Sequence, residues 1–418
     1  MSAAPVGPEI ITLGCRLNIS ESEALAAGLA GRSDVIIVNS CAVTNEAVRS
    51  TRQTIRKARR RRPDAHIVVT GCAAQVEPAM FEAMPEVDAV RGNVEKLTPQ
   101  LFLPESGSRS TVADIMAVHE TAPHLADAFS DHVRAFVEIQ NGCDHRCTFC
   151  IIPFGRGNSR SVPAGQVVDT VRRLVDQGYG EVVLTGVDVT SYGHDLPGGQ
   201  TLGHLVERII KLVPGLPRLR LSSLDGVEID PRLFDLITGE PRIMPHLHLS
   251  LQAGDNLTLK RMKRRHSREQ AVDLVNRLHA ARPEIAIGAD IIAGFPTESE
   301  AMFQNSLKIV DDCRIVHGHI FPYSARTGTP AARMPQIDVT LRKERAGLLR
   351  DAVARQKTRW LATQVGTWQK LLVEGGGRSG HTPNFAEVRM NAPANAGEII
   401  DIRITAARDG WLEGSRTA

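Results

Sequence analysis

Three of the seven cysteines stand close together in the sequence, at Cys143, Cys147 and Cys150, and we name them the loop triad. The spacing Cys-x3-Cys-x2-Cys allows one loop to place three thiolates on three corners of a [4Fe–4S] cluster, a centre that prefers thiolate ligands. A missing fourth protein ligand would leave one iron open to another molecule. A zinc knuckle and three incidental thiols are the alternatives. Zinc sites normally have four ligands, and no fourth cysteine is near, although His145 could complete such a site.

A second group, Cys15, Cys41 and Cys72, is spread over the first part of the chain, and we name it the strand-end triad. Each residue lies at or just after a short apolar run, in TLGCRLN, VNSCAVTNEA and VVTGCAAQ. Because open parallel sheets gather ligand groups along the edge where the strands end, the three thiolates could converge on a second cluster. The alternative is a small hydrophobic role for each cysteine, which is common for a single one. Cys313 has no motif partner, and we expect it to be a buried hydrophobic residue.

The composition narrows the class of protein. The odd number of cysteines, without an export signal at the N-terminus, argues against a disulfide framework. A length of 418 residues predicts two to three domains, and 42% apolar with 23% charged residues is typical of soluble globular proteins. No run reaches the roughly 18 apolar residues of a membrane span. We therefore expect a cytoplasmic protein without a membrane partner.

The elements that must position the strand-end triad alternate between strands and helices, which predicts a parallel α/β layer. Ser20 opens a Ser-x-x-Glu capping pattern at the first helix, and Thr44 or Asn45 caps the second. The expected elements are strands at 9–13, 34–40 and 66–72 and helices at 20–30 and 44–61.

Six further strand-like runs, separated by roughly 30–40 residues, predict an open or partial β/α barrel, because a full eight-unit barrel needs more length. Residues 97–132 lack periodicity and are interpreted as a linker. The last fifty or so residues form short strands separated by Gly, Asn and Pro, which indicates a small antiparallel β-barrel. The predicted fold class is α/β, with domains at 1–105, 131–360 and 361–418 and a linker at 106–130. The six runs are 134–140, 181–186, 218–224, 246–252, 285–295 and 315–323.

Basic residues concentrate in three runs, at 49–62, 260–265 and 341–360, although the net charge is only +3. Such stripes can neutralise the phosphates of a nucleic acid. Charge runs are also often solvated faces, so both interpretations stay open. Single-stranded bases are usually recognised by stacking, for which Trp368 and Phe385 are candidates.

The loop triad, with Phe149 before its last cysteine, resembles the signature of the radical S-adenosylmethionine (SAM) enzymes. The order of the two triads and the final barrel is similar to that of the methylthiotransferases, which have a flavodoxin-like N-terminal domain, a partial (β/α)6 radical-SAM barrel and a C-terminal TRAM domain. VTNEAVRSTRQ and CTFCIIPFGRGNSRS look most like the bacterial subgroup that modifies N6-threonylcarbamoyladenosine at tRNA position 37. The chain departs from the family where GRSDVIIVNSC follows the first helix directly, without the usual extra strand. The strand count of the first sheet therefore stays open.

This resemblance implies that a methylthio group is inserted at C2 of the modified adenosine by radical SAM chemistry. The loop triad would hold one [4Fe–4S] cluster, on which SAM is cleaved to methionine and a 5′-deoxyadenosyl radical. The strand-end triad would hold a second [4Fe–4S] cluster that keeps sulfur beside the target carbon. No catalytic residue is expected beyond these cluster ligands. The residues expected to bind SAM are Phe149, Asp188, Ser223, Gln252, Asp290 and Phe321.

The implied partners are the anticodon stem-loop of tRNA and an electron donor such as flavodoxin or ferredoxin. Two related reactions stay open, namely methylthiolation of isopentenyladenosine 37 in tRNA and of a ribosomal-protein aspartate. A hypothesis from another class is a non-catalytic iron–sulfur RNA-binding protein. Its cluster would be saturated by four ligands, and it would not bind SAM.

Overall fold

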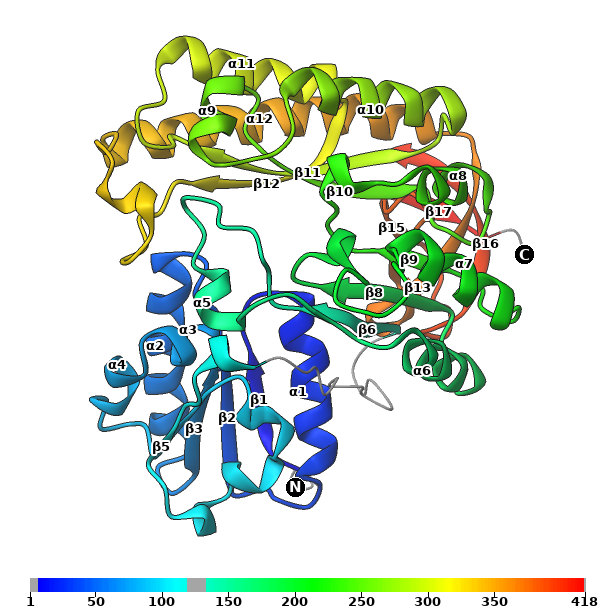
Figure 1. The fold of residues 1–418 in the computed structure, drawn as a ribbon. Coiled ribbons are helices and arrows are strands. Elements are labelled where there is room, and N and C mark those ends of the chain that lie inside the picture. Colours follow the sequence, from blue (N-terminus) through cyan, green and yellow to red (C-terminus); the bar gives the residue numbers. More distant parts are fainter. Residues whose placement is uncertain (1–6, 119–132, 417–418) are drawn as a thin grey trace.

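The computed structural model describes residues 7–118 and 133–416 of the chain. Figure 1 shows a first α/β layer, an open half-barrel of strands with helices on its outer side, and a small β-barrel near the C-terminus. This arrangement confirms the predicted fold class. Within the described ranges, no helix is both long and apolar enough to cross a membrane.

The first sheet has five parallel strands in the order β1-β2-β3-β4-β5. Alternate residues of a strand point to opposite faces. In β2, Ile36 packs in one core with Ile55 of α2, and Ile37 packs in another core with Leu25 of α1, so helices cover both faces (Figure 1). The strands are Glu9–Thr12 (β1), Val35–Ser40 (β2), His66–Gly71 (β3), Ala89–Arg91 (β4) and Ser110–Thr111 (β5), and the helices are Arg16–Gly28 (α1), Asn45–Arg61 (α2), Cys72–Val76 (α3) and Pro78–Glu82 (α4).

The first sheet has the flavodoxin-like order without one edge strand, and the start of α1 differs from the sequence-based expectation. A flavodoxin-like sheet has the order 2-1-3-4-5, and the order found here is the same with strand 2 absent, because the strand that follows α1 directly pairs with β1 on the side of β3. The predicted helix cap at Ser20 is wrong, because α1 already begins at Arg16. Ser20 is buried within the helix, and its hydroxyl donates to the backbone oxygen of Phe136 at 3.0 Å. The second helix begins as predicted, with the Thr44 hydroxyl accepting from the Ala47 N–H at 3.1 Å.

Part of the segment that was predicted to be a linker packs against the first sheet. Ser110–Thr111 forms β5, which pairs in parallel with β4. A 3₁₀ turn at Pro99–Phe102 buries the Phe102 ring in the core under α1. Residues 119–130 of the predicted linker lie outside the described residues.

The half-barrel contains six parallel strands in the order β6-β8-β9-β10-β11-β12, and each coincides with a predicted run. Isolated parallel bridges, such as Leu224 to Leu249, connect β9 to β10. A short strand, Arg160–Ser161 (β7), pairs antiparallel with β6 at the edge. The strands are Arg134–Asn141 (β6), Glu181–Gly186 (β8), Leu219–Leu221 (β9), His246–Gln252 (β10), Ala286–Ala293 (β11) and Ile315–Pro322 (β12), and the helices are Ile152–Arg156 (α5), Ala164–Asp176 (α6), Leu202–Leu212 (α7), Pro231–Gly239 (α8), Asn256–Arg261 (α9), Arg268–Ala281 (α10) and Glu300–Asp312 (α11).

The long helix Val339–Gln364 (α12) leads from the half-barrel into a closed barrel with the strand order β13-β14-β15-β17-β16. The predicted small β-barrel is confirmed, although β15 and β17 pair in parallel whereas the other neighbours are antiparallel. Alternate residues Ile400, Ile402 and Ile404 fill its core. The strands are Trp368–Glu374 (β13), Ser379–His381 (β14), Glu387–Met390 (β15), Ile399–Ala407 (β16) and Leu412–Ser415 (β17).

The C-terminal barrel contacts the half-barrel through Phe385. The Phe385 ring stacks on His246 with ring centroids 5.0 Å apart. His246 is the first residue of β10, so the contact lies at the N-terminal end of the half-barrel strands. The Arg220 guanidinium lies 4.8 Å from the centroid of the Phe385 ring. Phe385 is therefore already in contact with side chains of the half-barrel, whereas Trp368, the other candidate for stacking on RNA, is 52% exposed.

Candidate functional site

The loop triad lies directly after β6, in a loop that backbone hydrogen bonds hold in shape. The Cys143 N–H donates to the Gly157 oxygen at 3.0 Å, and the Cys150 N–H donates to the Cys147 oxygen at 3.1 Å. All three thiols are half-buried and free of disulfides. The loop thus presents three sulfur donors together at the C-terminal end of a barrel strand, where barrel enzymes place their active sites.

The surroundings of these thiols match the needs of a metal centre. Burial raises the pKa of Cys150 to about 12, and burial together with the nearby Asp188 carboxylate raises the pKa of Cys143 as well. These thiols therefore keep their protons at neutral pH until a metal displaces them. An Arg264 guanidinium nitrogen lies 3.7 Å from the Cys147 sulfur and supplies a positive charge for the thiolate form. Three thiols with one open position fit a [4Fe–4S] cluster.

Three connections at the C-terminal edge of the first sheet bring the strand-end triad together. Cys15 precedes α1, Cys41 follows β2 and Cys72 begins α3. A Cβ built on Gly14 would lie 2.9 Å from the Cys41 Cβ, so the first connection runs directly against the second. Burial, with smaller contributions from the nearby Cys72 and Cys15, raises the pKa of Cys41 to about 11. The three sulfur donors fit a second cluster with one open position.

Arg156 connects the two triads. It ends α5, the short helix that starts two residues after Cys150, and it is only 2% exposed. Its Nε–H donates to the Cys72 sulfur at 3.1 Å, while its terminal nitrogens bind Glu21 and Asn18 on α1. Burial alone would lower the pKa of Arg156, but Cys72 and Glu21 raise it well above its usual value. A permanent positive charge therefore faces the Cys72 sulfur.

A buried lysine completes this charged group between the first sheet and the half-barrel. Lys96 Nζ lies 2.5 Å from Glu21 Oε2 and 3.0 Å from Asn39 Oδ1. Lys96 and Glu21 are both almost fully buried. Since removing one partner of a buried ion pair leaves an unpaired buried charge, the group holds its side chains in one arrangement.

Asp188, the first of the residues predicted to bind SAM, lies after β8 and beside the loop triad. Its carboxylate accepts from the Ser191 hydroxyl at 2.8 Å and lies 2.9 Å from His145 Nε2. Hydrogen bonds to Asp188 and Glu228 raise the pKa of His145 to about 10, so its imidazole is a cation at neutral pH.

The other predicted residues lie near strand ends in different surroundings. Phe149 is partly buried and packs against a core that includes Phe295, which anchors the cysteine loop. Ser223 is exposed just after β9, and Gln252 ends β10 with a left-handed φ of 66°. Phe321 is 37% exposed on β12.

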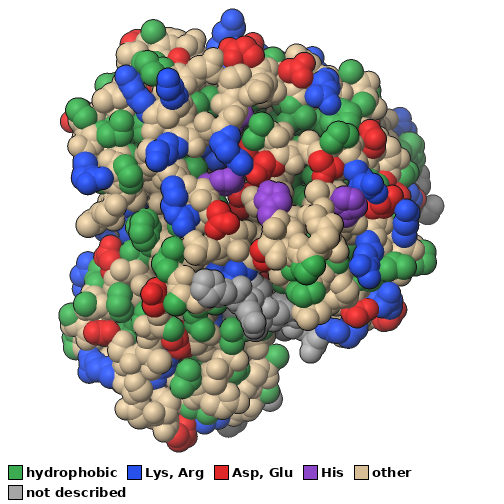
Figure 2. Space-filling model, viewed as in Figure 1, with side chains coloured by type: hydrophobic (Ala, Val, Ile, Leu, Met, Phe, Trp, Pro, Cys, Tyr) green, Lys and Arg blue, Asp and Glu red, His purple; other side chains and the backbone are tan. Residues whose placement is uncertain are grey.

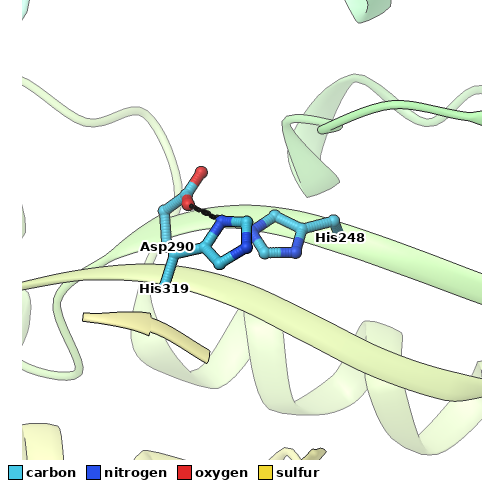
Figure 3. Close-up of side chains that lie close together, drawn as sticks. All are labelled: His248, Asp290 and His319. Carbon is cyan, nitrogen blue, oxygen red and sulfur yellow. Dashed lines mark hydrogen bonds and ion pairs between the residues drawn. The ribbon is translucent and has the colours of Figure 1, made fainter. Parts of the chain in front are cut away.

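Asp290, the remaining predicted residue, forms a cluster that the sequence analysis missed (Figure 3). Asp290 Oδ1 lies 3.0 Å from His248 Nε2 and 3.1 Å from His319 Nδ1. The three residues come from the neighbouring strands β10, β11 and β12. The signal was present in the alternation HLH at 246–248 and HGH at 317–319, because a period of two places both histidines of each strand on one face.

Some residues of each basic run form ion pairs within the protein. Arg59 lies 2.5 Å from Asp88, Arg264 lies 2.9 Å from Asp225, and the buried Arg345 pairs with Glu298. These arginines are structural, so each run offers fewer charges to a nucleic acid than the sequence indicated. The exposed cations of the runs include Lys57, Arg60, Lys260, Lys263, Lys343 and Arg350.

Two family models match the chain. A model described as Radical SAM superfamily matches residues 137–310, which span the half-barrel from β6 to α11. A model described as Uncharacterized protein family UPF0004 matches residues 8–92, which include the strand-end triad.

Relatives extend along almost the whole chain. A Rickettsia prowazekii protein named threonylcarbamoyladenosine tRNA methylthiotransferase MtaB is 48% identical and aligns over 97% of this chain and 96% of its own length. A Bacillus subtilis protein of the same name is 35% identical over 96% of this chain and 94% of its own. A Staphylococcus epidermidis protein named tRNA-2-methylthio-N(6)-dimethylallyladenosine synthase is 32% identical over 97% and 84%.

A solved structure shares the fold. The radical SAM methyltransferase TsrM of Kitasatospora setae has a TM-score of 0.53 and 15% identity, covering 78% of this chain and 77% of that chain. At this identity the likeness concerns the fold alone.

Proposed function

We propose that this chain, which belongs to the tRNA methylthiotransferases of the radical SAM superfamily, inserts a methylthio group at C2 of N6-threonylcarbamoyladenosine 37 in tRNA. The observation that carries this conclusion is the 48% identity, over nearly the full length of both chains, to a relative named for this nucleoside. The relative named for dimethylallyladenosine is 32% identical, so the prenylated nucleoside is less supported.

The superfamily implies SAM and a [4Fe–4S] cluster. We propose that Cys143, Cys147 and Cys150 hold this cluster, which when bound supplies the electron that cleaves SAM to a 5′-deoxyadenosyl radical. A radical is needed because the C2–H bond of adenine is strong and unactivated, so acid–base chemistry cannot exchange its hydrogen for sulfur. The loop backbone holds the thiols in place, and Arg264 offsets their negative charge.

We also propose that Cys15, Cys41 and Cys72 hold a second [4Fe–4S] cluster. The convergence of these residues at one sheet edge, with one ligand position open, supports a place to hold sulfur beside the target base. Arg156 would act here by holding the Cys72 sulfur through its Nε–H, while Glu21 and Asn18 fix its guanidinium.

The side chains at the strand ends would bind SAM and the substrate. Asp188, next to the loop triad and hydrogen-bonded to Ser191, would accept a hydrogen bond from a hydroxyl or amino group. Exposed Ser223 and the half-exposed Gln252 would supply further polar contacts, and Phe321 a flat apolar surface. Phe149 would act indirectly, by packing the loop onto the half-barrel.

The part of tRNA that is bound, the electron donor and the location in the cell also belong to the proposal. We propose that the anticodon stem-loop is the part of tRNA that enters the site, because position 37 lies in that loop. An electron donor such as flavodoxin or ferredoxin would reduce the loop-triad cluster, and the reaction would take place in the cytoplasm, where tRNA is modified. Exposed cations such as Lys263 and Arg350 would neutralise phosphates.

Mass spectrometry of tRNA nucleosides from a strain lacking the gene tests the substrate. The 2-methylthio derivative of threonylcarbamoyladenosine should disappear and return with the wild-type gene. If this mark persists while 2-methylthio-isopentenyladenosine disappears, the prenylated nucleoside is the substrate. If both tRNA marks persist and a ribosomal-protein aspartate loses its methylthio group, the target is a protein.

Anaerobic reconstitution tests the cofactors. Two clusters require about eight irons per chain, and a count of about four would contradict the second cluster. The reduced protein should release 5′-deoxyadenosine from SAM.

A further inference from the structure

The side chains of His248, Asp290 and His319 meet on the inner face of the half-barrel (Figure 3). All three lie far from both cysteine triads in the sequence. In the strand register, Asp290 of β11 stands beside His319 of β12, while His248 of β10 pairs with Gly288 of β11. The Oδ1 atom of Asp290 is shared by both imidazoles, at 3.0 Å from His248 and 3.1 Å from His319. The rings of the two histidines lie 4.4 Å apart between centroids.

The shared carboxylate determines which nitrogen atoms carry protons. Burial would raise the pKa of Asp290, but the hydrogen bonds from His248 and His319 hold it well below its usual range. An ionised carboxylate only accepts hydrogen bonds, so both facing nitrogens are N–H donors. In His319 this proton is on Nδ1, and the opposite nitrogen, Nε2, is left for another molecule.

Exposure separates the roles of the two histidines. The His248 side chain is 9% exposed and the His319 side chain is 65% exposed. His319 also shares one face of β12 with Phe321, because residues two apart in a strand point to the same side, and both are exposed while Ile320 between them is buried. Figure 2 shows histidine side chains gathered in the middle of one face of the molecule, among arginines and carboxylates.

This arrangement fits an anionic group attached to an aromatic ring system. An imidazolium whose Nδ1–H is bound to a carboxylate can donate a charge-assisted hydrogen bond from its Nε2–H to an anion. The neighbouring Phe321 ring offers a stacking surface for a base. The threonylcarbamoyl group carries a carboxylate, whereas an isopentenyl group is apolar and offers no anion.

We propose that His319, held by Asp290, binds the carboxylate of the threonylcarbamoyl group and thereby selects this nucleoside over unmodified or prenylated adenosine. The inference rests on the proposed function, because it names the group by which that substrate is recognised. It assigns Asp290 the role of a positioning residue for His319 and leaves the cysteine triads their own roles.

Binding to anticodon stem-loop RNA, followed by fluorescence anisotropy on the reconstituted protein, tests the proposal without turnover. Three RNAs are compared, carrying threonylcarbamoyladenosine, its neutral methyl ester or adenosine at position 37. Wild-type protein should bind the acid about tenfold or more tightly than the ester, the range expected for a hydrogen bond to a charged group. His319→Phe should bind the acid and the ester equally.

His279→Phe is the matched control, because it makes the same change on the outer helix α10, outside the His248–Asp290–His319 cluster. It should keep the wild-type ratio between acid and ester. Preservation of that ratio in His319→Phe would overturn the proposal, as would equal binding of both RNAs by the wild type. Metal analysis could also show that the wild type binds one equivalent of zinc or iron beyond its clusters and that His319→Phe loses it. The three residues would then be a metal site, and this result would overturn the proposal. A wild-type preference for the acid without any methylthiolation would leave the inference standing and contradict the proposed function.

Discussion

Individual cysteines are expected to have separable roles, because the two triads are built on different parts of the fold. Cys147→Ala should abolish release of 5′-deoxyadenosine from SAM while leaving about four irons on the protein. Cys41→Ala should still release 5′-deoxyadenosine but should form no methylthio product. Iron analysis and chromatography of the SAM products, on both variants side by side, measure these outcomes. Loss of SAM cleavage in Cys41→Ala would show that the triads do not act as separate centres.

Glu138 of β6 should make stability depend on pH near neutrality. Burial raises its pKa to about 7, Glu21 adds to the rise, and only its Oε1 is bonded, by the Asn141 amide at 2.8 Å. The folded protein keeps this proton up to about pH 7, whereas the unfolded chain releases it near 4.5. Folding therefore takes up a proton in this window, and the free energy of unfolding falls as pH rises, by up to about 1.4 kcal/mol per pH unit.

Glu138→Gln removes this titration and should flatten the change of the thermal midpoint between pH 5 and pH 8. Melting curves of both proteins across this range measure the effect. Equal slopes for the two proteins would show that the Glu138 side chain is ionised in the folded state throughout.

The cysteine ligands could be predicted from the sequence, whereas most of the residues that contact them could not. The cysteines could be found because their spacing and their places at strand ends are local signals. Arg156 and the His248–Asp290–His319 cluster could not be found in this way. Arg156 meets Glu21 across 135 residues of sequence, and His248 meets Asp290 across 42, so only the folded chain brings these partners together.

Among the elements, the loop after β6 depends on Gly142. Gly142 has a φ of +72°, and a Cβ there would lie 1.8 Å from the Asn158 backbone oxygen. Gly142→Ala should therefore displace the loop and reduce both the iron content and SAM cleavage. Gly31→Ala is the matched control, because Gly31 has a φ of +88° but a Cβ there would meet no atom within 4 Å. Equal loss of iron in both variants would mean that backbone strain alone, and not the contact with Asn158, is responsible.

The strands were the most predictable elements, because β-branched runs such as VIIVNS are buried on both faces of a parallel sheet. The start of α1 was less predictable. Ser20 has the composition of a cap, but its hydroxyl is used in a contact with β6 that the local sequence does not reveal. The strand order of the first sheet likewise depends on pairing between strands, which the amino-acid pattern within each strand does not specify.

For the molecule as a whole, Phe385 should determine how the C-terminal barrel is held. Its ring stacks on both His246 and His381, and the Arg134 and Arg220 guanidinium groups lie 5.1 and 4.8 Å from its centroid. Phe385→Ala should cost about 3 kcal/mol and expose the junction between α12 and β13 to proteolysis. Limited proteolysis followed by mass spectrometry locates the cleavage.

Trp368→Ala is the control for this experiment, since Trp368 is 52% exposed and its loss should leave the junction protected. If Phe385→Ala is digested at the same rate as Trp368→Ala, the barrel is held mainly by other contacts.

The short helix α5 has a consequence for how such a chain can change in evolution. Only five residues lie between Cys150 and Arg156, and Arg156 contacts the Cys72 sulfur of the other triad. An insertion or deletion in 151–155 would alter the distance between the two sulfur groups, so the length of this segment is constrained even where its side chains are free to vary. Substitutions at Glu21 or Asn18 are then expected to be epistatic with changes at Arg156, although they lie on α1 and far from Arg156 in the sequence. Substitutions at the residues of this contact would therefore depend on one another, whereas substitutions elsewhere in the first sheet and the half-barrel would be independent.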